Sequence, residues 1–372
     1  MSQTWSNDFL NRMKNTGDDL AESVIESLNR NKQLELANKY FAQPETNTHV
    51  LNDLPAELQR YIGKTSHLPE WADRQKILLA QHFFSTRGPV FGAVLLCGSL
   101  PVLYAGGLGG AQVLAATGQM SKHYERRAGE TLRFILSAME PGGLDPQAQG
   151  IRTIQRVRLM HAAIRHYAKH SPDKWPAKPD WGVPINQEEL VGTLLAFSSQ
   201  ALIGLNKMGV VPTEEEKQAY FHTWKVIGHL LGISPEIIPE TLESAAELWA
   251  AISRRNFMPS AAGRELAKAH LHFLEGLVPG HIFDGVVVAL MRYLMGRKIT
   301  EHDLGFPKPG FFSWLICVLR GVFGFKESLI DCSRTIKQIA EHDSILFMEG
   351  LANHWMRNDS KPFQIPASLT QR

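Results

Sequence analysis

The segment "RVRLMHAAIRHY" (residues 156–167) combines helical periodicity with an unusual set of side chains. It carries three arginines and two histidines among apolar residues, and no acidic residue occurs between positions 151 and 171. Arg158, His161 and Arg165 stand at i, i+3 and i+7, so a helix places them on one face. A solvated basic face would include Glu and Asp, so the pattern predicts a buried helix whose cationic stripe meets an anionic group.

Helical periodicity extends outward from this segment over most of the chain, and strand signals are scarce. Loops are marked by "EPGG" (140–143), "SPDKWPAKPDWGVP" (171–184), "GVVPTEE" (209–215) and "GFPKPGFF" (305–312). The pattern predicts helices over residues 54–64, 70–86, 121–139, 150–170, 186–208, 213–231, 235–254, 260–276, 281–297 and 334–357. The expected fold class is all-α.

Composition limits the function classes. With 44% hydrophobic and 20% charged residues, the chain of 372 residues is globular in type. Its 39 basic and 37 acidic side chains nearly balance, so we expect no nucleic-acid partner and only a local anion site. The three cysteines form neither a disulfide framework nor a zinc pattern. The N-terminal segment has no apolar secretion signal, so we expect a cytoplasmic protein.

Residues 88–120 contain no charged side chain and are long enough to span a bilayer. Glycines and a proline interrupt them, particularly at "GGLGG" (106–110), which disfavours one continuous helix. We therefore expect short buried helices beside a cavity, where the glycines let another backbone or a flat ligand approach closely. A membrane span, or a peripheral membrane contact, is the alternative.

The helix around His161 permits two interpretations. An imidazole between two guanidiniums matches haem b, whose iron accepts one imidazole and whose propionates need cationic partners. No CxxCH motif is present for covalent haem attachment. Alternatively, Arg158 and Arg165 pair with acidic residues on neighbouring helices. The residues alone leave both interpretations open.

The segment "HYERRAGETLRFIL" (123–136) offers a second candidate surface. One helical face collects a hydroxyl, a guanidinium and aromatic rings, from Tyr124, Arg127, Thr131 and Phe134. Glu130 lies beside them, and together these groups could line a small-molecule pocket. The alternative is an ordinary amphipathic helix with a weak Arg127–Glu130 surface pair.

In "YFHTWKVIGHLLGI" (220–233), His222 and His229 share one helical face. Seven residues of helix separate them by about 10 Å, too far to bind one ion together. We expect both to support the core or a neighbouring group.

These stretches resemble the family of latex clearing proteins (rubber oxygenases) and MpaB-type oxygenases, which are haem b proteins. The resemblance covers about residues 70–308, and the "RxxHAAxR" and "RxxxT" helices in that order are its most specific part. The matching stretches are "GAVLLCGSLPVLYAGGLGGAQVL" (92–114), "RRAGETLRFI" (126–135), "RVRLMHAAIRHY" (156–167), "YFHTWKVIGHLLGI" (220–233) and "ALMRYLMG" (289–296) followed by "LGFP" (304–307).

The resemblance implies one domain over residues 1–372, with a globin-like helical core around one non-covalent haem b. Residues 1–69 would be a helical N-terminal extension, and residues 309–372 a C-terminal helical extension and tail. His161 matches the family's proximal iron ligand. The residues that match its cofactor-binding positions are Arg158, Arg165, Arg127 and Thr131, while His222 and His229 match supporting histidines.

Two positions depart from the rubber-cleaving members that this chain resembles. Glu130 stands where those members have a lysine, which precedes the threonine and caps the iron. Their distal carboxylate, which acts as a base, aligns near Ala111, where this chain has no acid. We hypothesise that Glu130 takes over this role, so that Arg127, Glu130 and Thr131 form the catalytic set. Those members are also secreted, so polyisoprene is not the substrate expected here.

The expected function is therefore a haem b-dependent oxygenase. It would use O₂ to cleave a carbon–carbon double bond in an apolar, unsaturated substrate of isoprenoid or lipid-like character, as the resemblance implies. Two alternatives remain open: a haem-binding sensor or carrier without turnover, and a membrane-associated helical interaction protein. The sequence does not indicate the oligomeric state.

Overall fold

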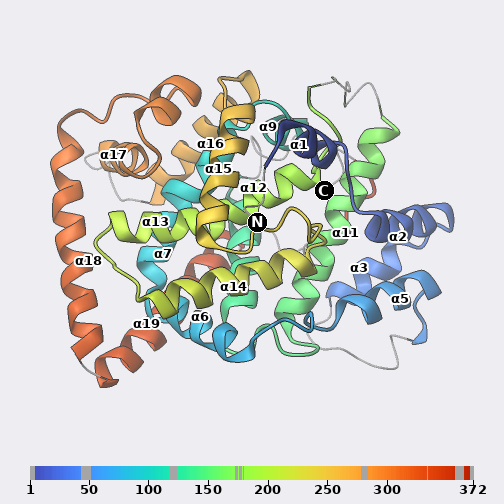
Figure 1. The fold of residues 1–372 in the computed structure, drawn as a ribbon, viewed down its shortest axis with the longest axis horizontal. Coiled ribbons are helices and arrows are strands. Elements are labelled where there is room, and N and C mark those ends of the chain that lie inside the picture. Colours follow the sequence, from blue (N-terminus) through green and yellow to red (C-terminus); the bar gives the residue numbers. More distant parts are fainter. Residues whose placement is uncertain are drawn as a thin grey trace.

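The computed structural model describes residues 5–42, 52–116, 124–171, 175, 178, 180–277, 284–332, 334–356 and 364–368. Within these residues the chain forms helices joined by loops, with one isolated antiparallel bridge between Gly106 and Phe257 (Figure 1). The all-α fold expected from the sequence is confirmed. The first residues of the helices expected over 121–139 and 281–297 lie outside the described residues.

Most of the longer helices follow the predicted segments closely, and three shorter helices precede them. The helix predicted over 235–254 is an exception: it begins only at Leu242, because the Thr241 side chain caps its first turn. In chain order the α-helices outside the apolar run are α1 (Asn7–Lys14), α2 (Asp19–Arg30), α3 (Leu34–Ala42), α5 (Ala56–Thr65), α6 (Arg74–Thr86), α9 (Gly110–Ala116), α10 (Tyr124–Met139), α11 (Gln149–Lys169), α12 (Gln187–Phe197), α13 (Ser199–Lys207), α14 (Glu214–Leu230), α15 (Leu242–Asn256), α16 (Ala261–Leu277), α17 (Asp284–Met295), α18 (Leu315–Cys332) and α19 (Arg334–Met356). Two further short elements are the π-helix η4 (Lys298–Asp303) and the 3₁₀ helix η5 (Gly310–Trp314).

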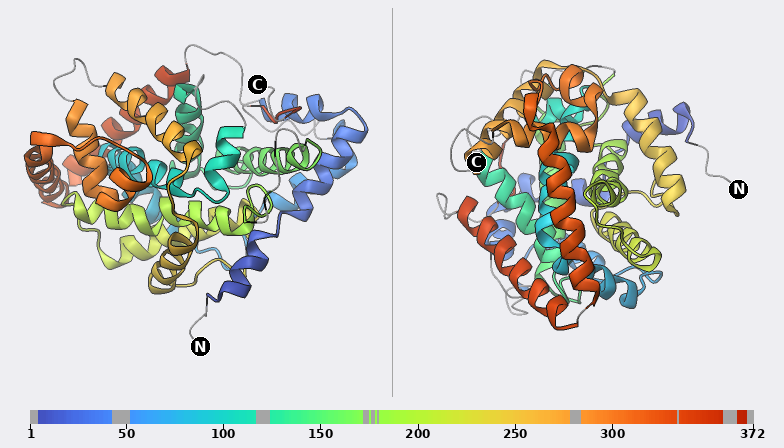
Figure 2. Two further views of the ribbon diagram at one scale, coloured as in Figure 1. Left: turned by 90° about the horizontal axis from the view of Figure 1, so that it is seen from above. Right: turned by 90° about the vertical axis from the view of Figure 1, so that its left-hand side faces the viewer.

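One prediction about helix number is wrong. The single helix predicted over 186–208 is broken at Ser198, where ψ is −91°. Ser198 Oγ donates to the carbonyl of Leu194, so consecutive serine hydroxyls compete for the backbone acceptors of the helix. Helix α18 lies within the C-terminal extension that was expected to be helical, but no individual helix was predicted there, because its two glycines weaken the helical signal. It lies at one end of the molecule beside α19 (Figure 2).

The apolar run forms several short elements: α7 (Gly88–Val94), the π-helical η1 (Leu95–Ser99), α8 (Leu100–Val102) and the 3₁₀ turn η2 (Leu103–Ala105). By length and composition, Gly88–Ala105 is one described helical stretch that could cross a membrane. However, 61% of it is buried within the protein, as in a core helix.

The N-terminal end of this run is also held inside the protein. The Arg87 side chain is only 4% exposed and lies over the ring of Phe83. Its guanidinium binds Glu327 on α18, with Nε 2.6 Å from Oε1, and lies 3.2 Å from Glu216 on α14. These buried ion pairs connect the run to the outer helices.

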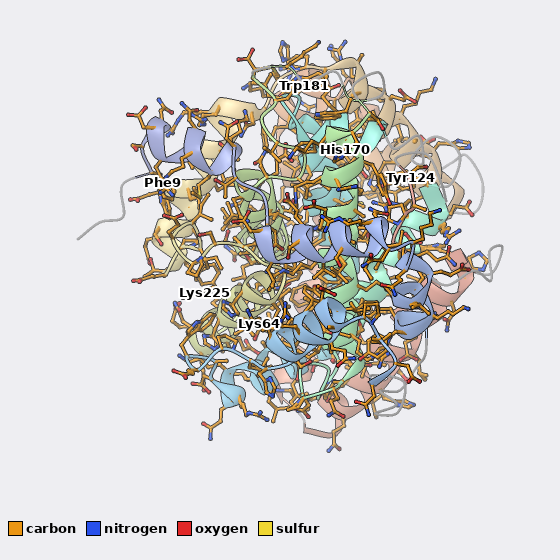
Figure 3. All side chains as sticks on the ribbon, turned by 90° about the vertical axis from the view of Figure 1, so that its right-hand side faces the viewer. Phe9, Lys64, Tyr124, His170, Trp181 and Lys225 are labelled. Atoms are coloured by element: carbon orange, nitrogen blue, oxygen red, sulfur yellow. The ribbon has the colours of Figure 1, made fainter. Side chains whose placement is uncertain are left out.

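Helix α11 passes between two hydrophobic clusters. Its residues Leu159, Ala162 and Ala163 pack with α2, α3 and α5 in one cluster. Ile151 and Ile154 belong to the main core, which contains α6, α7, α10 and α12 to α14. Figure 3 shows α2 crossing α11, with His170 near the end of α11. The N-terminal extension therefore packs directly on the helix that carries His161.

Candidate functional site

A cavity of about 320 Å³ opens among α10, α11, α12 and the glycine-rich loop before α9. Such a volume lies within the range of small-molecule sites. Its walls are mainly apolar and include Leu100, Leu103, Ile135, Phe197, Trp224 and Trp249. We refer to it as the central cavity.

Helix α11 presents His161 to the central cavity. The imidazole lies among Val157, Met160 and Ile164, which line the same wall. Their spacing is that of one helical face. The predicted iron ligand therefore lies in an apolar wall of the cavity.

Helix α10 brings three further predicted residues to the same cavity: Arg127, Glu130 and Thr131. The Thr131 hydroxyl donates to the Arg127 carbonyl at 3.0 Å. Glu130 accepts from Arg126 Nε at 3.1 Å and lies 3.9 Å from the Arg127 guanidinium. Tyr124, which was expected on this face, is instead bonded to Tyr104 and to the buried His270.

The structure does not place Arg158 and Arg165 at the cavity wall. Arg158 donates to both carboxylate oxygens of Asp18, at 2.6 and 2.9 Å. Arg165 Nε donates to Glu22 at 2.6 Å, and its Nη1 donates to the Ile185 carbonyl at 2.9 Å. The acids lie at the start of α2, which packs against α11. The two arginines thus pair with acids on a neighbouring helix, which is the alternative that the sequence left open. The expected contact of these arginines with a cofactor has no support in this geometry.

His222 and His229 lie outside the cavity wall, on α14. His222 Nε2 accepts a hydrogen bond from the Asp73 backbone N–H at 2.9 Å. The Trp71 ring meets both imidazoles edge-on, with centroids 5.7 and 6.0 Å away. Burial lowers the pKa of both histidines, which favours neutral rings. These contacts agree with the supporting role expected for them.

Several cavity residues were not predicted from the sequence. Glu188 and Glu189 line the cavity from the first turn of α12. In the sequence they resemble acids that simply complement a helix N-terminus, so no separate signal was visible. The C-terminal tail contributes Pro366, because Ile365 exchanges backbone hydrogen bonds with the Asn38 side chain at 2.7 and 3.1 Å. No local pattern in the tail predicts this contact.

Burial raises the pKa of Glu189 to about 8. The positive charge of Lys14 and the backbone N–H groups of Ile185 and Asn186 act in the opposite direction, and the charge of Glu188 adds to the increase. At neutral pH, therefore, Glu189 is mainly a neutral carboxylic acid inside the cavity wall.

The glycine-rich loop is shaped around this carboxyl group. Gly109 has φ of +141°, and a Cβ atom there would collide with Glu189 Oε1. We expect Gly109→Ala to destabilise the protein by about 1–3 kcal/mol, because it strains the backbone and displaces Glu189. Chemical denaturation measures the change. Gly110→Ala is the matched control, since a Cβ there would meet nothing within 4 Å. Equal stability of the two variants would contradict this account.

Comparison with known proteins identifies the family to which the chain belongs. Residues 89–319 match the model of the family described as "ER-bound oxygenase mpaB/B'/Rubber oxygenase, catalytic domain". The chain belongs to this family. The matched region begins later and ends later than the region of resemblance, about residues 70–308, and it contains Arg127, Glu130, Thr131 and His161.

A member of this oxygenase family, the rubber oxygenase of Streptomyces sp. (strain K30), is 25% identical over 327 residues, which are 84% of this chain and 76% of the relative. The fold is similar to that of latex clearing protein LCP in the closed state, with a TM-score of 0.74 and 21% identity. This match covers 90% of this chain and 91% of the other. The all-α architecture is therefore that of the mpaB and rubber oxygenase family.

Proposed function

We propose that this chain is a haem b-dependent oxygenase that cleaves a carbon–carbon double bond in an apolar, unsaturated substrate of isoprenoid or lipid-like character. The observation that carries the proposal is the position of the His161 imidazole in an apolar cavity that also contains Arg127, Glu130 and Thr131. Membership of an oxygenase family supports the reaction class.

The residues of the central cavity fit the chemical needs of haem b. His161 supplies the single imidazole that the iron takes from the protein, and Arg127 supplies a cation for a propionate. The apolar side chains of the walls suit the faces of the macrocycle. When bound, haem b would supply the binding and activation of O₂, which is chemistry of the cofactor.

The protein's own contribution is positioning and exclusion of water. The apolar walls hold the unsaturated chain in a dry environment, while Arg127 and Thr131 provide polar groups at α10. Glu130 is engaged by Arg126, so its carboxylate is held in place. In the overall reaction, one O₂ and one double bond give two carbonyl groups. Both oxygen atoms enter the products, and no external electrons are consumed.

The test combines a haem titration with an oxygen electrode. The purified chain is expected to develop a Soret band with added haem b, and then to consume O₂ when isoprenoid or unsaturated-lipid candidates are supplied. Mass spectrometry should detect two carbonyl products for each double bond cleaved. A coloured protein that consumes no oxygen with any candidate would instead be a sensor or carrier. A protein that stays colourless and partitions with membranes would contradict the haem proposal itself.

A further inference from the structure

One end of the central cavity is polar. Glu188 is 1% exposed, and its Oε1 accepts hydrogen bonds from Arg255 Nε at 3.1 Å and from Asn256 Nδ2 at 3.0 Å. Lys14 Nζ, also buried, donates to Asn256 Oδ1 at 2.9 Å. These contacts fix the Glu188 side chain in one position at the cavity wall.

Two carboxyl oxygens at this end lack a hydrogen-bond partner in the described part of the chain. Glu188 Oε2 and Glu189 Oε1 are buried, and neither has a hydrogen-bond partner among the described residues. Both side chains line the central cavity. A buried polar atom without a partner costs free energy, so a cavity that keeps two of them is suited to a ligand that satisfies them.

The charges at this end narrow the class of ligand. The Glu188 charge is compensated by Arg255, and the buried Lys14 adds a positive charge nearby, so a cationic head group is disfavoured. A carbonyl or carboxylate group only accepts hydrogen bonds and would leave Glu188 Oε2 unpaired. A hydroxyl group both donates and accepts.

We propose that this end of the cavity binds the hydroxyl end of an otherwise apolar, unsaturated chain. Glu188 Oε2 accepts a hydrogen bond from the hydroxyl group, and the protonated Glu189 donates one to its oxygen. That the bound molecule carries an unsaturated chain rests on the proposed function. The natural substrate is thus an unsaturated alcohol rather than a pure hydrocarbon.

The location of the polar end suits such an amphiphilic molecule. Leu108 of the glycine-rich loop lines the central cavity and also an open, polar surface hollow that includes Lys14, Arg255 and Asp180. The polar end therefore lies next to solvent, separated from it by the loop. The hydroxyl group stays near the surface while the apolar chain extends into the cavity.

Binding should depend on pH because Glu189 must keep its proton to donate. Lys14 on α1 and Glu188 on α12 act on this group, Arg255 on α15 is paired with Glu188, and Asp180 lies near Lys14. Below about pH 8 the carboxylic acid is present, and alcohol binding is strongest. As the pH rises through 8, the ionised group repels the lone pairs of the hydroxyl oxygen, and affinity falls.

The experiment compares a linear isoprenoid alcohol with the hydrocarbon of the same carbon skeleton. Their binding to the purified protein is followed by tryptophan fluorescence, since Trp224 and Trp249 line the cavity. We expect the alcohol to bind roughly tenfold more tightly or better at pH 7. Glu189→Leu should remove most of this preference. Glu215→Leu makes the same substitution at an exposed residue of α14 outside the cavity wall, and it should leave the preference unchanged.

Glu189→Gln provides the sharper control. Its amide N–H still donates but does not titrate, so the alcohol should bind this variant with little change between pH 7 and 9. Equal affinity of the wild type for alcohol and hydrocarbon would overturn the proposal, as would loss of turnover in Glu189→Leu with an unchanged preference. Because binding is measured without turnover, these outcomes are distinct from a failure of the haem assignment.

Discussion

Replacement of His161 by alanine is expected to abolish haem binding and reduce oxygenase activity to background. No other described residue of the cavity wall is a histidine, so the iron would lose its protein ligand. The readout is the Soret band of the reconstituted protein, followed by oxygen consumption. In His161→Gly, added free imidazole should restore part of the band, because it can occupy the vacated position.

The matched control is His166→Ala on the same helix. The His166 ring packs at a tilt against that of His170, with centroids 4.4 Å apart, and does not line the cavity. Its removal should leave the spectrum and the activity unchanged. A Soret band of equal strength in wild type and His161→Ala would show that another group binds the iron.

Removal of the negative charge of Asp18 is expected to destabilise the protein by about 3–5 kcal/mol, because it leaves the buried guanidinium of Arg158 uncompensated. The two side chains are only 5% and 11% exposed. Asp18→Asn is the most informative variant, since asparagine keeps the N-cap of α2 while the charge is lost. Equilibrium unfolding in denaturant measures the change.

Helix α2 offers its own control for this experiment. Glu26 and Arg30 form a pair whose side chains are 62% and 72% exposed, so Glu26→Ala should cost about 0.5 kcal/mol or less. In the double variant Asp18→Asn/Arg158→Met the buried charge is absent, and part of the lost stability should return. If Asp18→Asn cost no more than Glu26→Ala, the pair between α2 and α11 would be unimportant for stability.

Much of the fold was predictable because helical periodicity is local. The expected helices over 150–170 and 213–231 agree with α11 and α14 to within one residue at each end. The break at Ser198 was not predictable in the same way, since serine hydroxyls are common within helices and their competition for backbone acceptors depends on packing. Helix α18 was missed because its glycines weakened a local signal.

The candidate site, too, could be predicted only in part from the sequence. The face of α10 could be predicted, and Arg127, Glu130 and Thr131 do line the cavity. For α11, the sequence showed that the arginines required anionic partners, but it left open whether these were propionates or carboxylates. Asp18 supplies the partner of Arg158 from 140 residues away in the chain. No local pattern contains that information.

By itself, the sequence determined the all-α class and which residues share a face on each helix, because both follow from periodicity along a single helix. It also carried the resemblance that the family match later confirmed. Only the tertiary structure decided which faces meet. It directed His161 into the cavity and Arg158 toward α2, and it brought Glu188, Glu189 and Pro366 to the cavity wall. The physical reason is that burial and pairing depend on contacts between segments far apart in the chain, whereas periodicity depends only on neighbours.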